Sequence, residues 1–162
     1  MQLSDLFLKS GLSMPADCPD PVIGGIGCDS RSVEPGWLFA ALPGSTTDGR
    51  DYIGDALAHG VVAVLGPEGT ANTVSALAPD TRPQIAVIED ALPRRAYALL
   101  AASFYGHQPQ TCVAVTGTNG KTSTVHFVRA MWEQLDHKAS SMGTLGVRGV
   151  LERPESGMTT PD

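Results

Sequence analysis

The chain has 162 residues, of which 42% are hydrophobic and 17% charged, so it is apolar enough to bury a core and is not a disordered chain. Its formal net charge of −6 argues against a protein whose main task is to bind nucleic acid, because that task needs a basic surface. The three cysteines lack CxxC spacing and the four histidines lack metal-ligand spacing, which indicates a reducing compartment and no zinc site.

The N-terminal segment has no basic region followed by an apolar one, so it does not resemble a signal peptide. No run in the chain approaches the roughly 20 apolar residues that a membrane-spanning helix needs. The sequence therefore favours a cytoplasmic protein that does not bind membranes, and we expect it to be a monomer.

The first half of the chain alternates short apolar runs with segments of helical periodicity. A helix is expected over Leu3–Ser10, where Leu3, Leu6 and Phe7 share a face, and Gly11 is a typical helix end. The expected elements that follow are strands over Val22–Asp29 and Trp37–Leu42, a helix over about Asp51–His59, and strands over Val61–Leu65 and Gln84–Glu89.

The second half continues this alternation. We expect an apolar helix over Ala96–Phe104, a strand over Thr111–Thr116, and a helix that reaches about Leu135. The apolar residues expected on one side of that last helix are Val125, Val128, Met131, Trp132 and Leu135. Short apolar strands that alternate with helices predict an α/β fold with a largely parallel sheet.

A polar break at Gly106–Gln110 separates an apolar helix from the next apolar strand, and it predicts two domains, 1–108 and 109–162. In the second domain, one strand, one helix and a Gly-rich tail cannot cover both faces of a parallel sheet. We therefore expect this domain to be incomplete and the chain to be the front portion of a longer protein.

The segment Gly117-Thr-Asn-Gly-Lys-Thr122 has the features of a loop that binds ATP phosphates. Its glycines leave backbone N–H groups open between an expected strand and an expected helix, whose N-terminus favours anions. Lys121 is suited to contact the β- and γ-phosphates as a catalytic cation, and the hydroxyl of Thr122 is suited to bind Mg²⁺. The expected ATP-binding residues are Gly117, Thr118, Asn119, Gly120, Lys121, Thr122 and Ser123.

The loop departs from the usual pattern GxxxxGK[ST], because the first glycine of that pattern falls at Val115. The alternative interpretation is a Gly-rich turn between a strand and a helix, with an exposed lysine. A further class, a P-loop switch protein, needs additional nucleotide-binding motifs that do not follow the loop here.

The segment Thr116–Thr124 resembles the ATP loop of the Mur ligase family, which uses the shorter pattern seen here. Asp29–Gly44 and Asp48–Ile53 look like the N-terminal nucleotide-sugar domain of that family. Gly143–Gly146 and Thr159–Asp162 look like its later substrate-contacting segments. The resemblance covers nearly the whole chain, and four segments in this order are more specific than the loop alone.

The resemblance implies a UDP-sugar-binding α/β domain followed by the truncated start of a P-loop ATPase domain. It also implies ATP and Mg²⁺ as cofactors. In the family, a carbamylated lysine, further Mg²⁺ ligands and the amino-acid selector lie beyond the position of Asp162. On this interpretation the chain binds ligands at best and does not turn over alone.

The resemblance also implies residues that bind the UDP-linked substrate. Ser30 is expected on the uridine part, although Asp29–Arg31 can also be read as a turn at a strand end. Arg50 is expected to brace the loop after Gly44 or to lie at the surface. The remaining expected substrate-binding residues are Ser45, Thr46, Thr47, Thr159 and Thr160.

Within the family, the combination is most similar to members that add the third amino acid, meso-diaminopimelate or L-lysine, to UDP-N-acetylmuramoyl-L-alanyl-D-glutamate through an acyl phosphate. The sequence leaves open which amino acid is added. Two alternatives also remain: the sister ligase that adds D-Ala-D-Ala, and a non-catalytic module that binds a UDP-linked muramoyl peptide.

Overall fold

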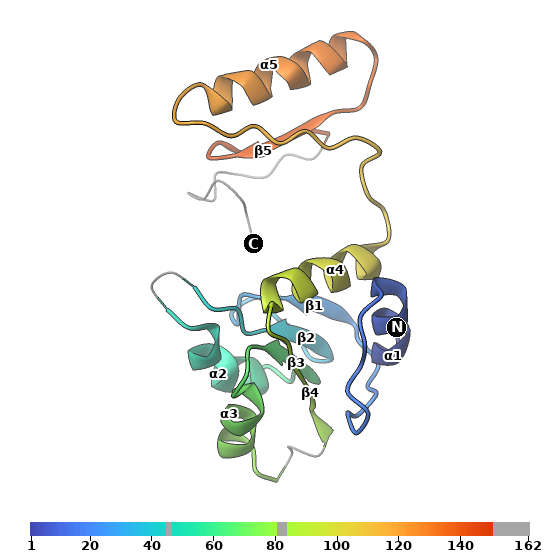
Figure 1. The fold of residues 1–162 in the computed structure, drawn as a ribbon, viewed down its shortest axis with the longest axis vertical. Coiled ribbons are helices and arrows are strands. Elements are labelled where there is room, and N and C mark those ends of the chain that lie inside the picture. Colours follow the sequence, from blue (N-terminus) through green and yellow to red (C-terminus); the bar gives the residue numbers. More distant parts are fainter. Residues whose placement is uncertain (45–46, 81–83, 151–162) are drawn as a thin grey trace. The chain divides into compact units, whose positions relative to one another are not determined.

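The computed structural model describes residues 1–44, 47–80 and 84–150, and its chain divides into two compact units, Met1–Gln108 and Pro109–Asp162. The first unit contains a sheet flanked by helices (Figure 1). The second contains helix α5 (Lys121–Gln134) and a hairpin of strands β5 (Ser140–Gly143) and β6 (Gly146–Gly149).

A parallel sheet forms the centre of the first unit. Its strand order is β1-β2-β3-β4, and each neighbouring pair is parallel. The strands are β1 (Gly25–Gly27), β2 (Trp37–Ala40), β3 (Ala63–Gly66) and β4 (Ala86–Glu89). All of them overlap the apolar runs from which strands are expected, so the predicted α/β fold with a parallel sheet is confirmed.

Helices cover both faces of this sheet (Figure 1). Helices α1 (Leu3–Ser10) and α4 (Pro93–Tyr105) pack on one face. Helices α2 (Ile53–Ala58) and α3 (Thr70–Leu77) pack on the other, and the 3₁₀ turn η1 (Gly49–Tyr52) leads into α2. The unit is therefore a three-layer α/β/α arrangement, which explains why its strands are apolar on both sides.

The side chains of β2 show how the two cores are built. Leu38 and Ala40 point to the α1–α4 face, and Phe39 points to the α2–α3 face. All three are at most 1% exposed, so successive side chains enter opposite cores. A strand buried on both faces needs no polar alternation, which is why period-two patterning is absent from the sequence.

Helix ends follow the glycine pattern that the sequence predicts. α1 spans the expected Leu3–Ser10 and ends where Gly11 adopts a φ of 69°. The N–H of Gly11 bonds to the carbonyls of both Leu8 and Phe7. Helix α3 has no counterpart among the predictions. Its sequence is Thr-Ala-Asn-Thr-Val-Ser-Ala-Leu, and Thr70 and Val74 are its buried residues, so it lacks a clear apolar stripe.

The strand expected over Thr111–Thr116 is absent from the described structure, and this prediction is wrong. The segment lies mostly exposed and pairs with neither β5 nor β6. An apolar run becomes a strand only when another strand supplies hydrogen-bond partners. The hairpin of β5 and β6 was not predicted, because Ser140–Gly143 is not a β-branched run.

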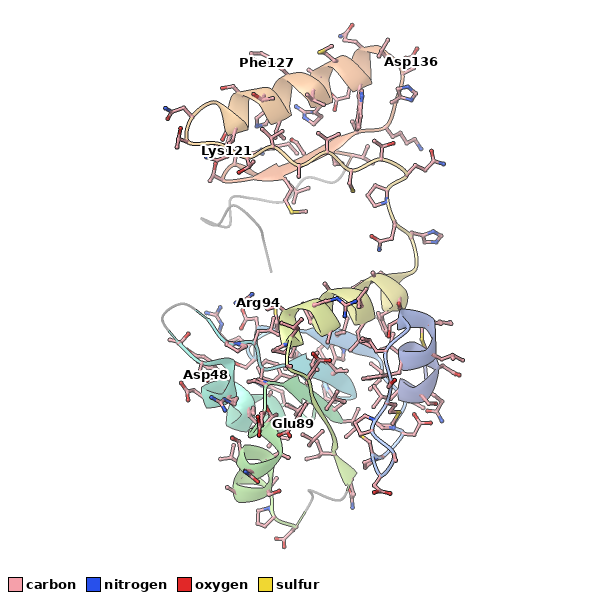
Figure 2. All side chains as sticks on the ribbon, in the orientation of Figure 1. Asp48, Glu89, Arg94, Lys121, Phe127 and Asp136 are labelled. Atoms are coloured by element: carbon pink, nitrogen blue, oxygen red, sulfur yellow. The ribbon has the colours of Figure 1, made fainter. Side chains whose placement is uncertain are left out.

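Helix α5 matches the expected helix closely, but its predicted apolar face is only partly packed. Val125, Val128 and Trp132 are half-buried, as expected. Met131 and Leu135, which were expected on the same side of the helix, are each 65% exposed, so the described residues leave that part of the helix uncovered. Phe127 is 70% exposed and lies on the outer side of α5 (Figure 2).

Candidate functional site

The loop that precedes α5 has a backbone that favours glycine at two positions. Gly117 has a φ of 144° and Gly120 a φ of 79°, both in the region that residues with a side chain rarely adopt. Gly120 is the N-cap of α5, so the chain turns sharply from the loop into the helix. The glycine spacing of the sequence is thereby accounted for by the turn itself.

The N–H groups of this loop are free to bind a ligand. No described residue accepts a hydrogen bond from the N–H groups of residues 117–123. The N–H of Thr124 is the first that bonds back, to the carbonyl of Gly120 at 2.9 Å. Free N–H groups at the N-terminus of a 14-residue helix form a site that attracts anions.

Lys121 lies at the first position of α5 and turns back over the loop. Its Nζ donates to the carbonyl oxygen of Gly117 and, at 3.4 Å, contacts that of Thr118. Lys121 has no carboxylate partner among the described residues. The cation is therefore held at the loop by carbonyl groups, close to the free N–H groups.

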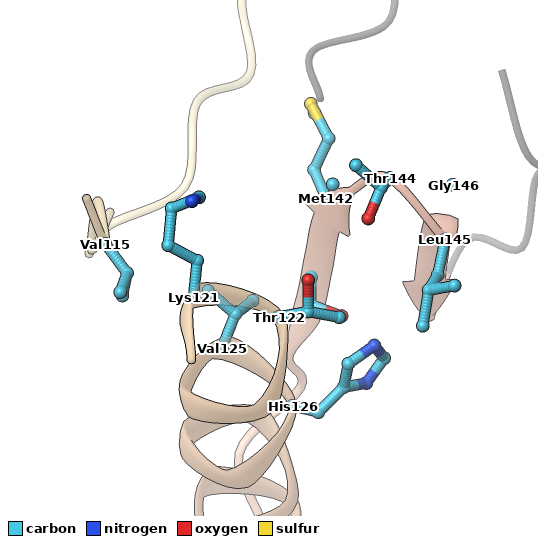
Figure 3. A pocket seen from close by; sticks show the side chains of 11 residues that line it. Val115, Lys121, Thr122, Val125, His126, Met142, Thr144, Leu145 and Gly146 are labelled. Atoms are coloured by element: carbon cyan, nitrogen blue, oxygen red, sulfur yellow. The ribbon is translucent and has the colours of Figure 1, made fainter. Parts of the chain in front are cut away.

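A small cavity of about 90 Å³ lies between the start of α5 and the β5–β6 hairpin (Figure 3). Lys121, Thr122 and His126 line it from the helix, and Thr144 and Leu145 line it from the two-residue turn of the hairpin. A pocket for a drug-sized ligand is roughly 300 Å³ or more, so this cavity accommodates only part of a nucleotide.

The cavity is lined by two segments that lie apart in the sequence, the start of α5 and the β5–β6 turn. Gly143–Gly146, expected to contact substrate, forms the hairpin turn beside Lys121 and Thr122. His126 was not predicted as a site residue. It follows Thr122 by four positions and so shares its helix face, and this spacing is the signal that could have identified it.

In the first unit, Ser30 follows β1 at the carboxyl edge of the sheet. Ser30 is 5% exposed, and no described residue forms a hydrogen bond with its hydroxyl. Ligands of open parallel sheets bind beyond the carboxyl ends of the strands. Ser30 is thus a nearly buried residue, with a hydroxyl that has no described partner, at the edge where a ligand is expected.

The turn that holds Ser30 is built by its two neighbours. The carboxylate of Asp29 accepts from the backbone N–H of Arg31 at 3.0 Å and from its guanidinium at 2.9 and 2.7 Å. These bonds, those of the Arg31 side chain first, lower the pKa of the Asp29 carboxyl. The turn interpretation and the binding interpretation of Asp29–Arg31 are therefore compatible.

Asp48 and Arg50 repeat this arrangement after β2. The Asp48 carboxylate accepts from the Arg50 backbone N–H at 2.9 Å and from Nη2 at 2.6 Å. The side-chain bonds are the main cause that lowers the pKa of Asp48. Arg50 also donates to the carbonyl of Glu68, so it braces the loop rather than lying free at the surface.

Thr47 lies next to this pair, in the loop that follows β2. Its carbonyl accepts from the N–H of Gly44 at 2.9 Å, and Thr47 itself is exposed. β1 and β2 are neighbours in the sheet, so the structure places Ser30 and Thr47 after adjacent strands. Four expected substrate-binding residues lie outside the described residues: Ser45, Thr46, Thr159 and Thr160.

Within the described residues there is no group of three or more His, Cys, Asp or Glu side chains that could hold a metal ion. Among the same residues no helix combines the length and the apolar character that crossing a membrane requires. The hydroxyl of Thr122, which lines the cavity beside Lys121, is the expected Mg²⁺ ligand that the structure places at the loop.

Two family models match the chain. Residues 22–105 match the Mur ligase family, catalytic domain, and residues 115–162 match the Mur ligase middle domain. The first match covers the sheet and the loops at its carboxyl edge. The second covers the phosphate loop, α5 and the hairpin.

Curated relatives carry one shared name, UDP-N-acetylmuramoyl-L-alanyl-D-glutamate--2,6-diaminopimelate ligase. A relative from Caulobacter vibrioides is 47% identical over 99% of this chain and 31% of its own length. Relatives from Rhizobium meliloti and Bradyrhizobium diazoefficiens are 43% and 44% identical, over 100% of this chain and 32% and 31% of their own lengths. The chain thus spans about a third of the length of the curated relatives it matches.

Proposed function

Because the chain belongs to the Mur ligase family, we propose that it supplies the sugar-nucleotide and ATP-phosphate sites of an ATP-dependent amide ligase. The reaction is the addition of meso-diaminopimelate to UDP-N-acetylmuramoyl-L-alanyl-D-glutamate. The observation that carries the proposal is the loop of free N–H groups and Lys121 at the start of α5. The choice of amino acid rests on the shared name of the relatives.

The phosphate loop would hold the polyphosphate of ATP. The free N–H groups of residues 117–123 would donate to anionic phosphate oxygens. They include the N–H groups of Thr118, Asn119 and Ser123. Lys121 would leave the loop carbonyls and contact the β- and γ-phosphates. The hydroxyl of Thr122 would be one ligand of Mg²⁺, which neutralises phosphate charge when it is bound.

In this reaction the substrate carboxylate attacks the γ-phosphorus of ATP, and ADP leaves. The resulting acyl phosphate is attacked by the amine of the incoming amino acid, which forms the amide bond and releases phosphate. The free loop N–H groups, and Lys121 once it has left the loop carbonyls, would stabilise the negative charge that moves in the first step. Their contribution is to stabilise the transferred phosphoryl group and to hold it in line.

The UDP-linked substrate would bind at the carboxyl edge of the sheet. Ser30 offers an unbonded hydroxyl for the uracil ring, and Thr47 lies after the neighbouring strand. The family resemblance extends this site to Ser45 and Thr46 and, at the muramoyl-peptide end, to Thr159 and Thr160. These four assignments rest on the sequence alone.

We also propose that the protein acts as a monomer in the cytoplasm, where ATP and UDP-linked precursors are made. The three cysteines, Cys18, Cys28 and Cys112, are free of disulfides in the structure, which suits a reducing compartment. Analytical ultracentrifugation with and without the UDP-linked dipeptide tests the oligomeric state, and a stable dimer would contradict it.

A chimeric ligase tests the proposed function. The 162 residues of this chain replace the matching third of the Caulobacter vibrioides relative, and product formation is followed by mass spectrometry. We expect an amide product with meso-diaminopimelate that requires ATP. The family's amino-acid selector lies beyond the position of Asp162, so the Caulobacter portion of the chimera supplies it, and the assay tests ATP-dependent ligation and not the choice of amino acid. A chimera that binds the UDP-linked dipeptide but forms no product would favour the non-catalytic binding module.

A further inference from the structure

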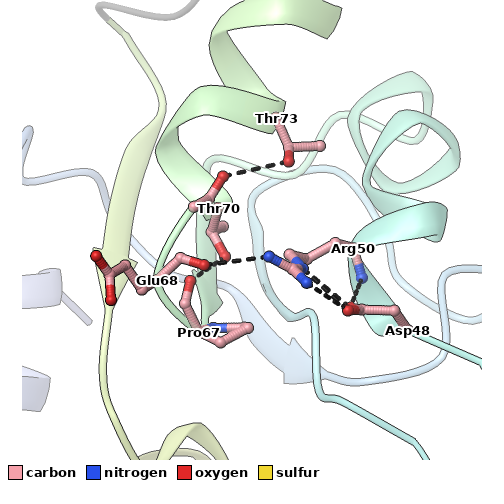
Figure 4. A network of polar contacts seen from close by, with 7 residues as sticks. Asp48, Arg50, Pro67, Glu68, Thr70 and Thr73 are labelled. Atoms are coloured by element: carbon pink, nitrogen blue, oxygen red, sulfur yellow. Dashed lines mark hydrogen bonds and ion pairs between the residues drawn. The ribbon is translucent and has the colours of Figure 1, made fainter.

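The guanidinium of Arg50 joins two loops at the carboxyl edge of the sheet (Figure 4). Its Nε lies 3.1 Å from each carboxylate oxygen of Asp48, and its Nη2 lies 2.6 Å from Oδ2. On its other side, Nη1 donates to the backbone carbonyl of Glu68 at 3.1 Å. Asp48 follows β2 and Glu68 follows β3, so one side chain connects the exits of two neighbouring strands.

The loop around Glu68 is held by several hydrogen bonds. The hydroxyl of Thr70 is completely buried and donates to the carbonyl of Pro67 at 2.6 Å. The hydroxyl of Thr73 donates to the carbonyl of Gly69 at 3.3 Å (Figure 4). The carboxylate of Glu89 on β4 accepts from the N–H of Ala71 at 2.8 Å. A group bonded to this turn is therefore held against the sheet.

Gly69 leaves the space that Arg50 occupies. A Cβ placed at Gly69 would lie 3.2 Å from Nη1 of Arg50, and the φ of Gly69 is 92°. A residue with a side chain would be strained at this φ and would crowd the guanidinium. The turn thus fits Arg50 both by its carbonyl and by the absence of a side chain.

Asp48 closes the loop that contains Thr47. Pro43 and Asp48 form an isolated bridge, and the N–H of Gly44 bonds to the carbonyl of Thr47 at 2.9 Å. Immediately after the loop, the N–H of Gly49 bonds to the carbonyl of Leu42 at 3.0 Å. The position of Asp48 therefore sets where both ends of this loop lie.

We infer that Arg50 is a positioning residue for the sugar-nucleotide site: by bonding to both Asp48 and the turn at Glu68, it fixes Gly44 and Thr47, the described neighbours of the Pro43–Asp48 bridge, where the substrate would bind. This role rests on the proposed function, because it concerns the same site. Arg50 itself does not contact the ligand. Residues that are already fixed lose less conformational freedom when the ligand binds, which strengthens binding.

The pair of Asp29 and Arg31 shows what distinguishes Arg50. It has the same two-residue spacing and a similar fork of bonds. The Arg31 side chain is 87% exposed, and it bonds to no described residue other than Asp29. The Arg50 side chain is 36% exposed and reaches a second loop. The link between loops, not the ion pair, is the feature that carries the inference.

The planar fork of arginine is essential to this geometry. It contacts both oxygens of Asp48 while a third nitrogen reaches Glu68, which the single ammonium of lysine cannot do. Arg50→Lys keeps the charge and removes the link. Asp48→Asn keeps the side-chain shape and weakens the pair from the other side. Arg95→Lys, on α4, is the matched control, because Arg95 has no described partner.

The test measures the Kd of UDP-N-acetylmuramoyl-L-alanyl-D-glutamate for the 162-residue chain by isothermal titration calorimetry at 20 °C. Circular dichroism melts establish that each variant is folded at that temperature. We expect Arg50→Lys and Asp48→Asn to raise Kd by about 10-fold or more, because Gly44 and Thr47 must then be fixed on binding. Arg95→Lys keeps the wild-type Kd, and all variants keep the Kd of MgATP.

Each outcome decides between the two proposals. If the wild-type chain binds the UDP-linked dipeptide and folded Arg50→Lys binds it equally well, Arg50 has no positioning role and the proposed function stands. If Arg50→Lys and Asp48→Asn are both unfolded at 20 °C, the pair serves overall stability and the inference is wrong. If the wild-type chain does not bind the dipeptide, the proposed substrate site fails and the inference fails with it.

Discussion

The ammonium of Lys121 donates to the backbone carbonyl of Gly117, four residues earlier, so this lysine bonds within its own loop. A second carbonyl, that of Thr118, lies 3.4 Å from the same nitrogen. Meanwhile the N–H groups of residues 117–123 have no acceptor among the described residues. A polyphosphate can therefore take the lysine from the carbonyls while it binds the free N–H groups.

Lys121→Ala removes the cation and leaves the loop backbone unchanged. In the chimeric ligase we expect turnover to fall at least about 100-fold, because a group that stabilises the charge of phosphoryl transfer is lost. Lys138→Ala is the control, since Lys138 is exposed and has no described partner. Wild-type turnover by Lys121→Ala, with an unchanged helical circular dichroism signal, would remove Lys121 from the mechanism.

Ser30→Ala tests the proposed uracil contact. The Ser30 hydroxyl has no hydrogen-bond partner among the described residues, so its loss should leave the fold stable while one hydrogen bond to the ligand disappears. We expect the Kd for UDP to rise about 3- to 10-fold. Ser75 is an exposed residue of α3 whose hydroxyl bonds only to the carbonyl of Ala71, so Ser75→Ala should leave Kd unchanged. Equal affinities for the two variants would place the nucleotide elsewhere.

Replacing each of two glycines after β2, Gly49 and Gly54, by alanine should change the stability of the chain in opposite directions. A Cβ at Gly49 would lie 2.4 Å from the backbone nitrogen of Leu42, so Gly49→Ala should destabilise the chain by about 2 kcal/mol or more. A Cβ at Gly54 in α2 would meet only Leu77, at 3.9 Å, so Gly54→Ala should stabilise it by about 0.5–1 kcal/mol. Urea unfolding measures both, and shifts of the same sign would contradict this packing.

The Asp48 carboxylate predicts a specific dependence of stability on pH. Its pKa is lowered below 3.8 in the folded chain, chiefly by the hydrogen bonds of the Arg50 side chain. A folded pKa below the unfolded value adds stability that is complete above the unfolded pKa and is lost as pH falls through the folded one. The pairs of Asp29 with Arg31 and of Asp20 with Ser4 act in the same direction.

Comparison with Asp48→Asn isolates this contribution. We expect the variant to be less stable than the wild type at pH 6, where the carboxylate is charged in both states. The difference should shrink as the pH falls below about 4, because the wild-type carboxyl then becomes protonated. Guanidinium unfolding at pH 6 and pH 3 measures it. A difference of equal size at both pH values would mean that the charge on Asp48 does not contribute.

The predictable part of this fold is the part that local chemistry determines. Gly11 ends α1 because the helix needs a left-handed residue there, and that requirement is visible in the sequence. Thr111–Thr116 is an apolar run like those that form β1–β4, but it forms a strand only if a partner strand lies beside it, and the local sequence does not show whether one does. Helix α3 was missed for a related reason: the cap on its N–H groups comes from Glu89, eighteen residues further along the chain.

The candidate site divides in the same way. The sharp turn into α5 could be predicted from the glycine spacing, and phosphate binding by the Gly117–Thr122 loop stays a prediction. The cavity shared by His126 and Thr144 could not be predicted, because the two residues meet only when the β5–β6 turn lies beside α5. Arg50 was expected to brace its loop, but its bond to Glu68 joins residues eighteen positions apart and required the structure.

The most direct measurement is a ¹⁵N NMR titration of the 162-residue chain with MgATP. We expect the amide signals of Gly117, Gly120 and Lys121 to shift most, since their N–H groups have no acceptor among the described residues. Amides of the first unit, such as that of Ser30, should respond to UDP instead. Unchanged signals over residues 117–122 at millimolar MgATP would contradict the central claim that this loop binds phosphate.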